Sequence, residues 1–100
     1  MNDRLSLQES KSLHRFGLYY IFTINDLLNV LPHRVGLEHD YDNTKLFMTI
    51  DEKDRWVAGY HYSDEFNPPI IEIDFHRNSL IEALYALVCW CGENKILNDD

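Results

Sequence analysis

Three short segments in the middle of the chain, 45–50, 56–62 and 69–75, constrain the fold more than any other feature. In each of them apolar residues occupy every second position, and the linkers between them are polar and only five or six residues long. Period-two alternation is typical of half-buried strands, and short linkers favour antiparallel neighbours. We therefore predict a three-stranded antiparallel meander.

The alternation also predicts which side chains share a face of this sheet. In the third strand, Ile71, Ile73 and Phe75 are expected to point to one side. The second face of the sheet is expected to carry Phe47, Val57 or Ile70, depending on the register of the strands. Exposed apolar groups of this kind usually mark a contact surface.

Three helix-start signatures lie outside the strands. Each places Ser or Thr three residues before an acid, as a capping box requires: Ser6 with Glu9, Thr23 with Asp26, and Ser79 with Glu82. The helices are expected over about 7–16, 24–31 and 80–93. Gly17 and Pro32 end the first two.

The order of elements is therefore α-α-β-β-β-α, and we predict an α+β fold with the helices packed on one face of the sheet. The 100 residues suit a single domain over 1–100. With 45% hydrophobic residues, the chain can form a core without disulfides or metals.

Charge limits the classes of partner. The net charge is −8, and the span from Glu38 to Asp74 holds ten acids but only three bases. A surface of this sign repels phosphate backbones, so direct binding to nucleic acid is not expected. No apolar run approaches the length needed to cross a membrane and no leader pattern is present, so we expect a soluble cytoplasmic protein.

The two cysteines, Cys89 and Cys91, lie two positions apart in the last predicted helix. At about 100° per residue their side chains point in different directions, so they cannot form a disulfide or bind one metal together. We expect two reduced, unreactive thiols, in keeping with a reducing compartment.

Three longer segments resemble a known group of proteins. They are residues 5–13 closing at Gly17 and Leu18, residues 23–32, and residues 78–85 continuing into 89–94. In this order around three strands, they resemble small uncharacterised proteins encoded by phages and mobile elements of anaerobic gut bacteria, and more loosely the α/β/α sandwich domains of phage proteins. The resemblance implies a fold and a genomic setting, and it brings no activity.

A loop and the end of the third strand contain the residues best suited to bind a metal. The candidates are His39, Asp40, Asp42, Asp74 and His76. A site would need three or four of them to converge on one ion, which their spacing allows but does not require. We predict no metal or other cofactor, and keep a small metal-binding regulator or enzyme as an alternative.

Catalytic motifs are missing from the sequence, so we predict a non-enzymatic protein-interaction module, with a homodimer as one form of it. The residues expected at an interface are Trp90, Trp56, Asp51, Glu52 and Asp54. The three acids also suit an alternative, an inhibitor that mimics nucleic acid and binds a basic host enzyme. The identity of a protein partner does not follow from the sequence.

Overall fold

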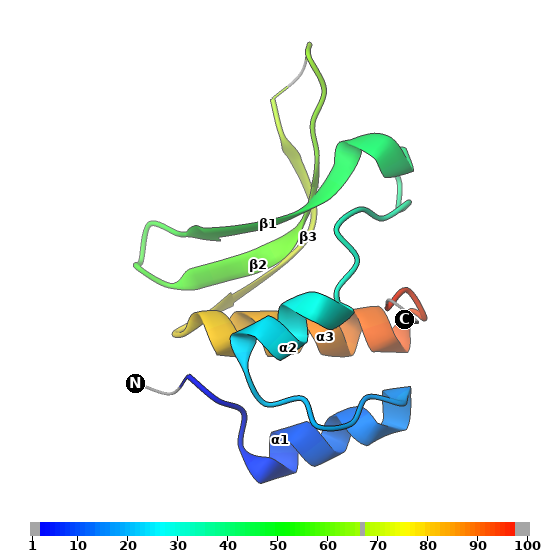
Figure 1. Ribbon diagram of the computed structural model, residues 1–100. Helices are drawn as coiled ribbons and strands as arrows, with labels where there is room; N and C mark the ends of the chain where they lie inside the picture. Colours follow the sequence, from blue (N-terminus) through cyan, green and yellow to red (C-terminus); the bar gives the residue numbers. More distant parts are fainter. Residues whose placement is uncertain (1–2, 67, 98–100) are drawn as a thin grey trace.

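The computed structural model describes residues 3–66 and 68–97, and it has the predicted order of elements (Figure 1). The helices are α1 (Leu7–Ser12), α2 (Ile24–Val30) and α3 (Leu80–Glu93), with short 3₁₀ turns η1 (Leu13–Phe16) and η2 (Tyr41–Asn43). The strands are β1 (Thr44–Ile50), β2 (Trp56–Tyr62) and β3 (Ile70–Arg77). The prediction of a small α+β fold is confirmed.

The sheet is an antiparallel meander in the order β1-β2-β3, with β2 in the centre. Tyr60 lies opposite Ile73, whereas the next residue, His61, lies opposite Ile71. Glu72 is the extra residue of a bulge in β3, and it reverses the alternation at this point. The prediction that Ile71 shares a face with Ile73 was therefore wrong.

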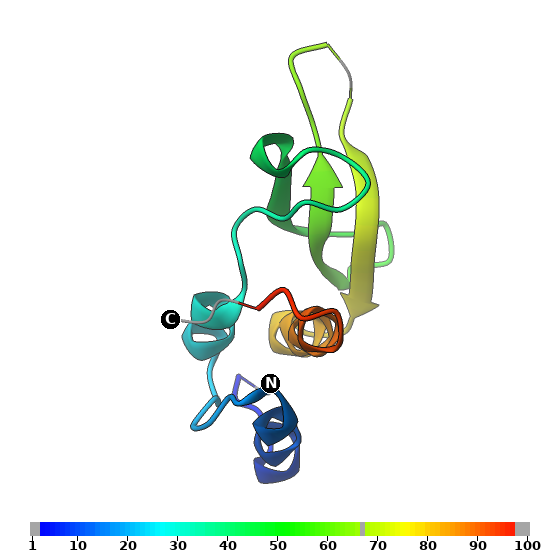
Figure 2. The ribbon, with the colours of Figure 1, turned by 90° about the vertical axis from the view of Figure 1, so that its right-hand side faces the viewer.

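The helices form two further layers on one side of the sheet. Helix α3 lies directly beneath β2 and β3, α2 runs beside it, and α1 lies on the far side of α3 from the sheet (Figures 1 and 2). Helices on one face were predicted. The position of α1, in a third layer away from the sheet, was not.

The second face of the sheet is covered by no described helix. Its residues include Phe47, which stacks on His61 with ring centroids 4.7 Å apart, and Val57, which is buried. Because of the bulge, Ile71 joins this face in place of Ile70.

Two of the three predicted capping boxes are complete. Ser6 accepts from the amide of Glu9 while the Glu9 carboxylate accepts from the amide of Ser6, and Thr23 and Asp26 do the same. At α3 only half of the box forms. Ser79 accepts from the Glu82 amide, but the Glu82 carboxylate accepts from the Ser79 hydroxyl.

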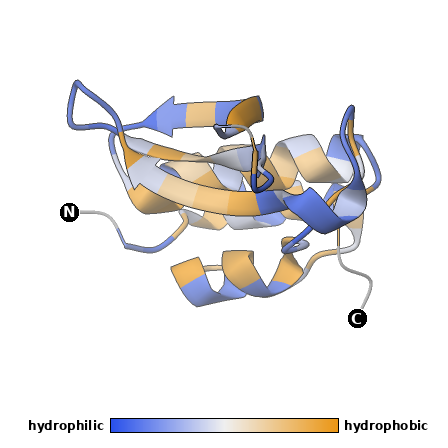
Figure 3. Ribbon diagram, turned by 90° about the horizontal axis from the view of Figure 1, so that it is seen from above, coloured by the Kyte–Doolittle hydropathy of each residue, from blue (hydrophilic) through white to orange (hydrophobic). Residues whose placement is uncertain are grey.

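The core lies between the sheet and α3 and continues downwards to α1. Leu13, Leu27, Leu84 and Leu87 are fully buried, together with Tyr60 of the central strand. The Tyr60 hydroxyl donates to the carbonyl of Pro32 at 2.8 Å, which satisfies its polar end. In Figure 3 the loops at the ends of the sheet are hydrophilic, whereas the strands and helices contain apolar stretches.

Gly59 lies where the backbones of β2 and β3 approach each other most closely among the glycine positions. A Cβ atom there would lie 2.0 Å from the carbonyl oxygen of Ile73 and 2.8 Å from the Cα of Asp74. Both are backbone atoms of the paired strand, so Gly59→Ala should destabilise the fold by about 3 kcal/mol in urea unfolding. Gly36→Ala is the control, because its Cβ would meet only Tyr41 at 3.9 Å. Equal stability of the two variants would contradict this account.

Candidate functional site

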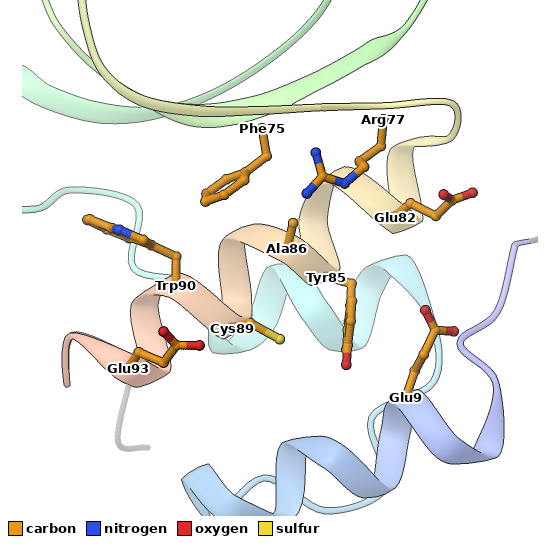
Figure 4. Close-up of a pocket in the computed structure, with 9 residues that line it drawn as sticks. All are labelled: Glu9, Phe75, Arg77, Glu82, Tyr85, Ala86, Cys89, Trp90 and Glu93. Atoms are coloured by element: carbon orange, nitrogen blue, oxygen red, sulfur yellow. The ribbon is translucent and has the colours of Figure 1, made fainter.

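A solvent-open groove of about 480 Å³ lies between β3 and α3, on the flank of α3 away from α2 (Figure 4). Its apolar surface is formed by Phe75, Tyr85, Ala86, Cys89 and Trp90, and its charged rim by Glu9, Arg77, Glu82 and Glu93. We call this feature the β3–α3 groove.

Helical spacing explains the apolar surface. Tyr85 and Cys89 are four residues apart, as are Ala86 and Trp90, so the two pairs form neighbouring rows on one flank of α3. Other residues of the same helix, including Leu84 and Val88, are fully buried in the core. Helix α3 is therefore apolar on more of its circumference than the core uses.

Hydrogen bonds hold the walls of the groove. The Tyr85 hydroxyl lies 2.5 Å from Ser12 Oγ, which ties α3 to α1, and burial is the main factor that raises the pKa of Tyr85. On the β3 side, the Arg77 guanidinium lies 5.7 Å from the centre of the Phe75 ring and donates to the carbonyl of His76 at 2.8 Å. The groove thus has ordered sides.

The groove continues along β3 through Trp90. That side chain also lines a second hollow, of about 360 Å³, with Leu37, Ile70, Ile71 and neighbouring acids. The carboxylate of Glu72 closes this end, because it accepts hydrogen bonds from the amides of Glu38 and His39 at 3.3 Å and 3.0 Å. A loop is thereby held against the bulge of β3.

Strand β3 forms the edge of the sheet next to the groove. It pairs with β2 on one side, and no other strand of the described chain pairs with it. An edge strand presents a row of backbone N–H and C=O groups that can bond to another chain. The apolar β3–α3 groove and the open edge of β3 therefore lie side by side.

The predicted metal-binding residues do not converge on one point: Asp74 and His76 are hydrogen-bonded to each other, and His39, Asp40 and Asp42 lie elsewhere. His39 pairs with Glu72 and stacks on Tyr62 at a centroid distance of 4.3 Å. Asp40 accepts from the side-chain amide of Asn43, and Asp42 lies in η2. Within residues 3–66 and 68–97, no three His, Cys, Asp or Glu side chains are arranged to hold one ion.

His76 lies between two carboxylates. Its Nδ1 is 2.7 Å from Asp51 Oδ2 and its Nε2 is 2.8 Å from Asp74 Oδ2. The bond to Asp51, and then the bond to Asp74, raise the pKa of His76 above its ordinary value of 6.5. Because both ring nitrogens are engaged, neither is free to accept a proton from a substrate or to bind a metal.

Asp51 has a structural role that the sequence did not reveal. Besides His76, it accepts from the backbone amides of Lys53 and Arg55 at 2.8 Å and 2.9 Å, which closes the β1–β2 turn. The hydrogen bond from His76 is the main factor that lowers the pKa of Asp51. The carboxylate thus makes hydrogen bonds within the protein to both the turn and the end of β3.

Of the five predicted interface residues, Trp90 alone lines the β3–α3 groove. Trp56 is partly buried and packs against the core, and Glu52 and Asp54 are exposed in the β1–β2 turn. Phe75 and Tyr85 also line the groove, and neither was predicted as an interface residue. The four-residue spacing of Tyr85 and Cys89 was a usable signal, but the sequence alone did not show which flank of α3 is left open.

The two cysteines are free, as predicted. Cys91 is fully buried and donates to the Tyr60 hydroxyl at 3.8 Å, and burial raises its pKa to about 11, so its thiol is unreactive at neutral pH. Cys89 differs from Cys91 in its surroundings. It is only partly buried and lines the groove.

The Asp51–His76–Asp74 cluster should make stability depend on pH. The raised pKa of His76 contributes stability that is complete below pH 6.5 and is lost as pH rises through the folded pKa. The lowered pKa of Asp51 contributes stability above pH 3.8 that is lost in acid. His76→Gln should therefore reduce the free energy of unfolding more at about pH 5.5 than at about pH 9.

Urea unfolding at the two pH values measures this difference, and an NMR titration of the His76 ring measures its pKa directly. A folded-state pKa at or below 6.5 would show that the imidazolium is not held by the two carboxylates. His14→Gln is the matched control, because His14 is exposed and lies far from the cluster in the sequence.

None of the described helices is long and apolar enough to cross a membrane. Comparison with known proteins found no family model, no curated protein and no solved structure that matches this chain. The resemblance to proteins of phages and mobile elements thus stays a prediction.

Proposed function

We propose that this protein is a non-enzymatic protein-interaction module and that its partner docks in the β3–α3 groove. The observation that carries the proposal is the combination of an aromatic groove with an unpaired strand edge. Aromatic side chains such as Tyr85 and Trp90 are the residues most enriched at energetically important interface positions.

Partial burial strengthens this argument. Phe75, Tyr85 and Trp90 are neither fully buried nor fully exposed, so each has one side supported by the protein and another open to solvent. Covering such side chains removes apolar surface from water and immobilises little that is not already ordered. Binding in the groove is therefore favourable for a partner of complementary shape.

We further propose that the module works in the cytoplasm. Cys89 and Cys91 are both unpaired, which suits a compartment that keeps thiols reduced.

The acidic end of the sheet supports a second candidate function, that of a nucleic-acid mimic. Glu38, Asp40, Asp42 and Glu65 lie around η2 and the β2–β3 loop, next to the exposed rings of Tyr41 and Phe66. A basic enzyme could bind this surface, and Asp42→Lys with Glu65→Lys should then abolish inhibition. Asp51 should be left unchanged in that test, because it closes the β1–β2 turn.

A selection from a random peptide library tests the main proposal. Ala86 lines the groove on α3, and Ala86→Arg places a long side chain in it without disturbing the helix. Peptides selected on the unchanged protein should bind the variant at least about tenfold more weakly in fluorescence anisotropy. Gln8→Arg, an exposed change of equal charge on α1, should bind them normally.

Binders that are equally affected by Ala86→Arg and Gln8→Arg, or unaffected by both, would place the interaction elsewhere. Circular dichroism of the variants checks that each is folded. A selection that yields no binder sensitive to Ala86→Arg would overturn the proposal.

A further inference from the structure

We infer that the occupant of the β3–α3 groove is an extended, basic polypeptide segment that adds a fourth strand to the open edge of β3. The inference rests on the proposed function, because it assumes that the groove docks a protein. It adds the conformation and the charge of the segment.

The edge offers a regular stretch of suitable length. From Ile73 to Arg77, β3 pairs without interruption with β2, and the bulge at Glu72 ends this stretch. Five residues of strand extend about 16 Å, and the segment of α3 from Glu82 to Glu93 extends about the same distance. The open edge and the groove-lining flank of α3 are therefore of similar length, and Phe75 and Arg77 of this stretch line the groove together with α3.

Side-chain alternation then divides the roles within the added strand. Every second side chain would point to the helix side, where Phe75, Ala86 and Trp90 provide apolar surface. The side chains between them would point to the second face of the sheet and to solvent. Backbone hydrogen bonds would contribute affinity, and the helix-facing side chains would select the sequence.

Charge favours a basic segment. The groove rim holds three glutamates, Glu9, Glu82 and Glu93, and one arginine, Arg77. Glu93 also pairs with Arg15 at 3.5 Å, but both side chains are more than half exposed, so this surface pair leaves the Glu93 carboxylate accessible to a basic partner. Glu82 and Glu93 lie at the two ends of the α3 flank, with the apolar residues between them (Figure 4). An extended segment with apolar residues in its centre and Lys or Arg at its ends fits this pattern.

A second copy of this chain fits the groove less well. In a dimer formed through the β3 edge, two acidic rims would approach each other, and the chain already carries a net charge of −8. Like charges brought together across an interface oppose association. A dimer through this edge is accordingly one of the outcomes that would overturn the inference.

The probe is a synthetic, fluorescently labelled peptide, Lys-Thr-Leu-Thr-Leu-Thr-Lys, with blocked ends. As a strand it places lysines and leucines on one face and threonines on the other. It should bind the full chain in fluorescence anisotropy, and replacing both lysines by glutamate should weaken binding about tenfold or more at low salt. Equal binding of the two peptides would refute the basic character of the partner.

Backbone methylation tests strand addition. In an edge strand only alternate amides face the neighbouring strand, so the peptide is methylated either at its third and fifth amides or at its second and fourth. One methylated peptide should lose binding about tenfold and the other should retain it. If both bind equally well, or both lose binding to the same extent, the segment does not pair with β3.

Rim variants locate the contact. Glu93 is exposed at one end of the groove, and Glu93→Lys should weaken binding of the basic peptide about fivefold, with a smaller effect at high salt. Glu52→Lys makes the same charge change in the β1–β2 turn and should have little effect. Equal losses in the two variants would indicate attraction by net charge alone.

The outcomes separate the two levels of the proposal. If library-selected peptides bind in the groove but are acidic, helical or indifferent to methylation, the inference fails and the interaction module stands. If no peptide binds in the groove, both fail. Light scattering that shows a dimer, converted to a monomer by Ala86→Arg, would identify a second copy as the occupant.

Discussion

The packing of α3 against β2 and β3 is the interaction on which the rest of the structure depends. Leu84, Leu87 and Val88 are removed from water between the sheet and the other helices, and apolar burial of this kind is the main stabilising contribution in a small domain. Helix α2 and the turn η1 then pack on α3 rather than forming cores of their own. Because these neighbours occupy only part of its circumference, one flank stays open and becomes the wall of the groove.

The polar chemistry of the protein is largely directed at holding its loops. Glu72 binds two amides and the ring of His39, and Asp51 closes the β1–β2 turn while it pairs with His76. The histidines and acids that suggest a metal site in the sequence thus bond to one another and to backbone amides. The acidic groups that face solvent lie at the η2 end of the sheet, in the β1–β2 turn and on the groove rim.

Local signals predicted the elements well. The boundaries of β2 match the predicted 56–62, and the capping boxes at Ser6 and Thr23 are complete, because caps and alternation depend on residues within one turn or one strand. The errors lie where distant residues meet. The bulge at Glu72 moved Ile71 to the other face, and the pairing of Asp51 with His76 joins residues that are far apart in the chain.

By itself the sequence determined the number and order of the elements, the antiparallel meander and the apolar character of the last helix, since each follows from local periodicity. Only the tertiary structure decided which flank of α3 is covered, where α1 lies, and that Phe75 and Trp90 share one groove beside an open strand edge. Such facts depend on how layers stack. A helix with apolar residues on more than one flank can bury any of these flanks in a core. Which flank is buried depends on the elements that pack against the helix, and those elements lie far away in the chain.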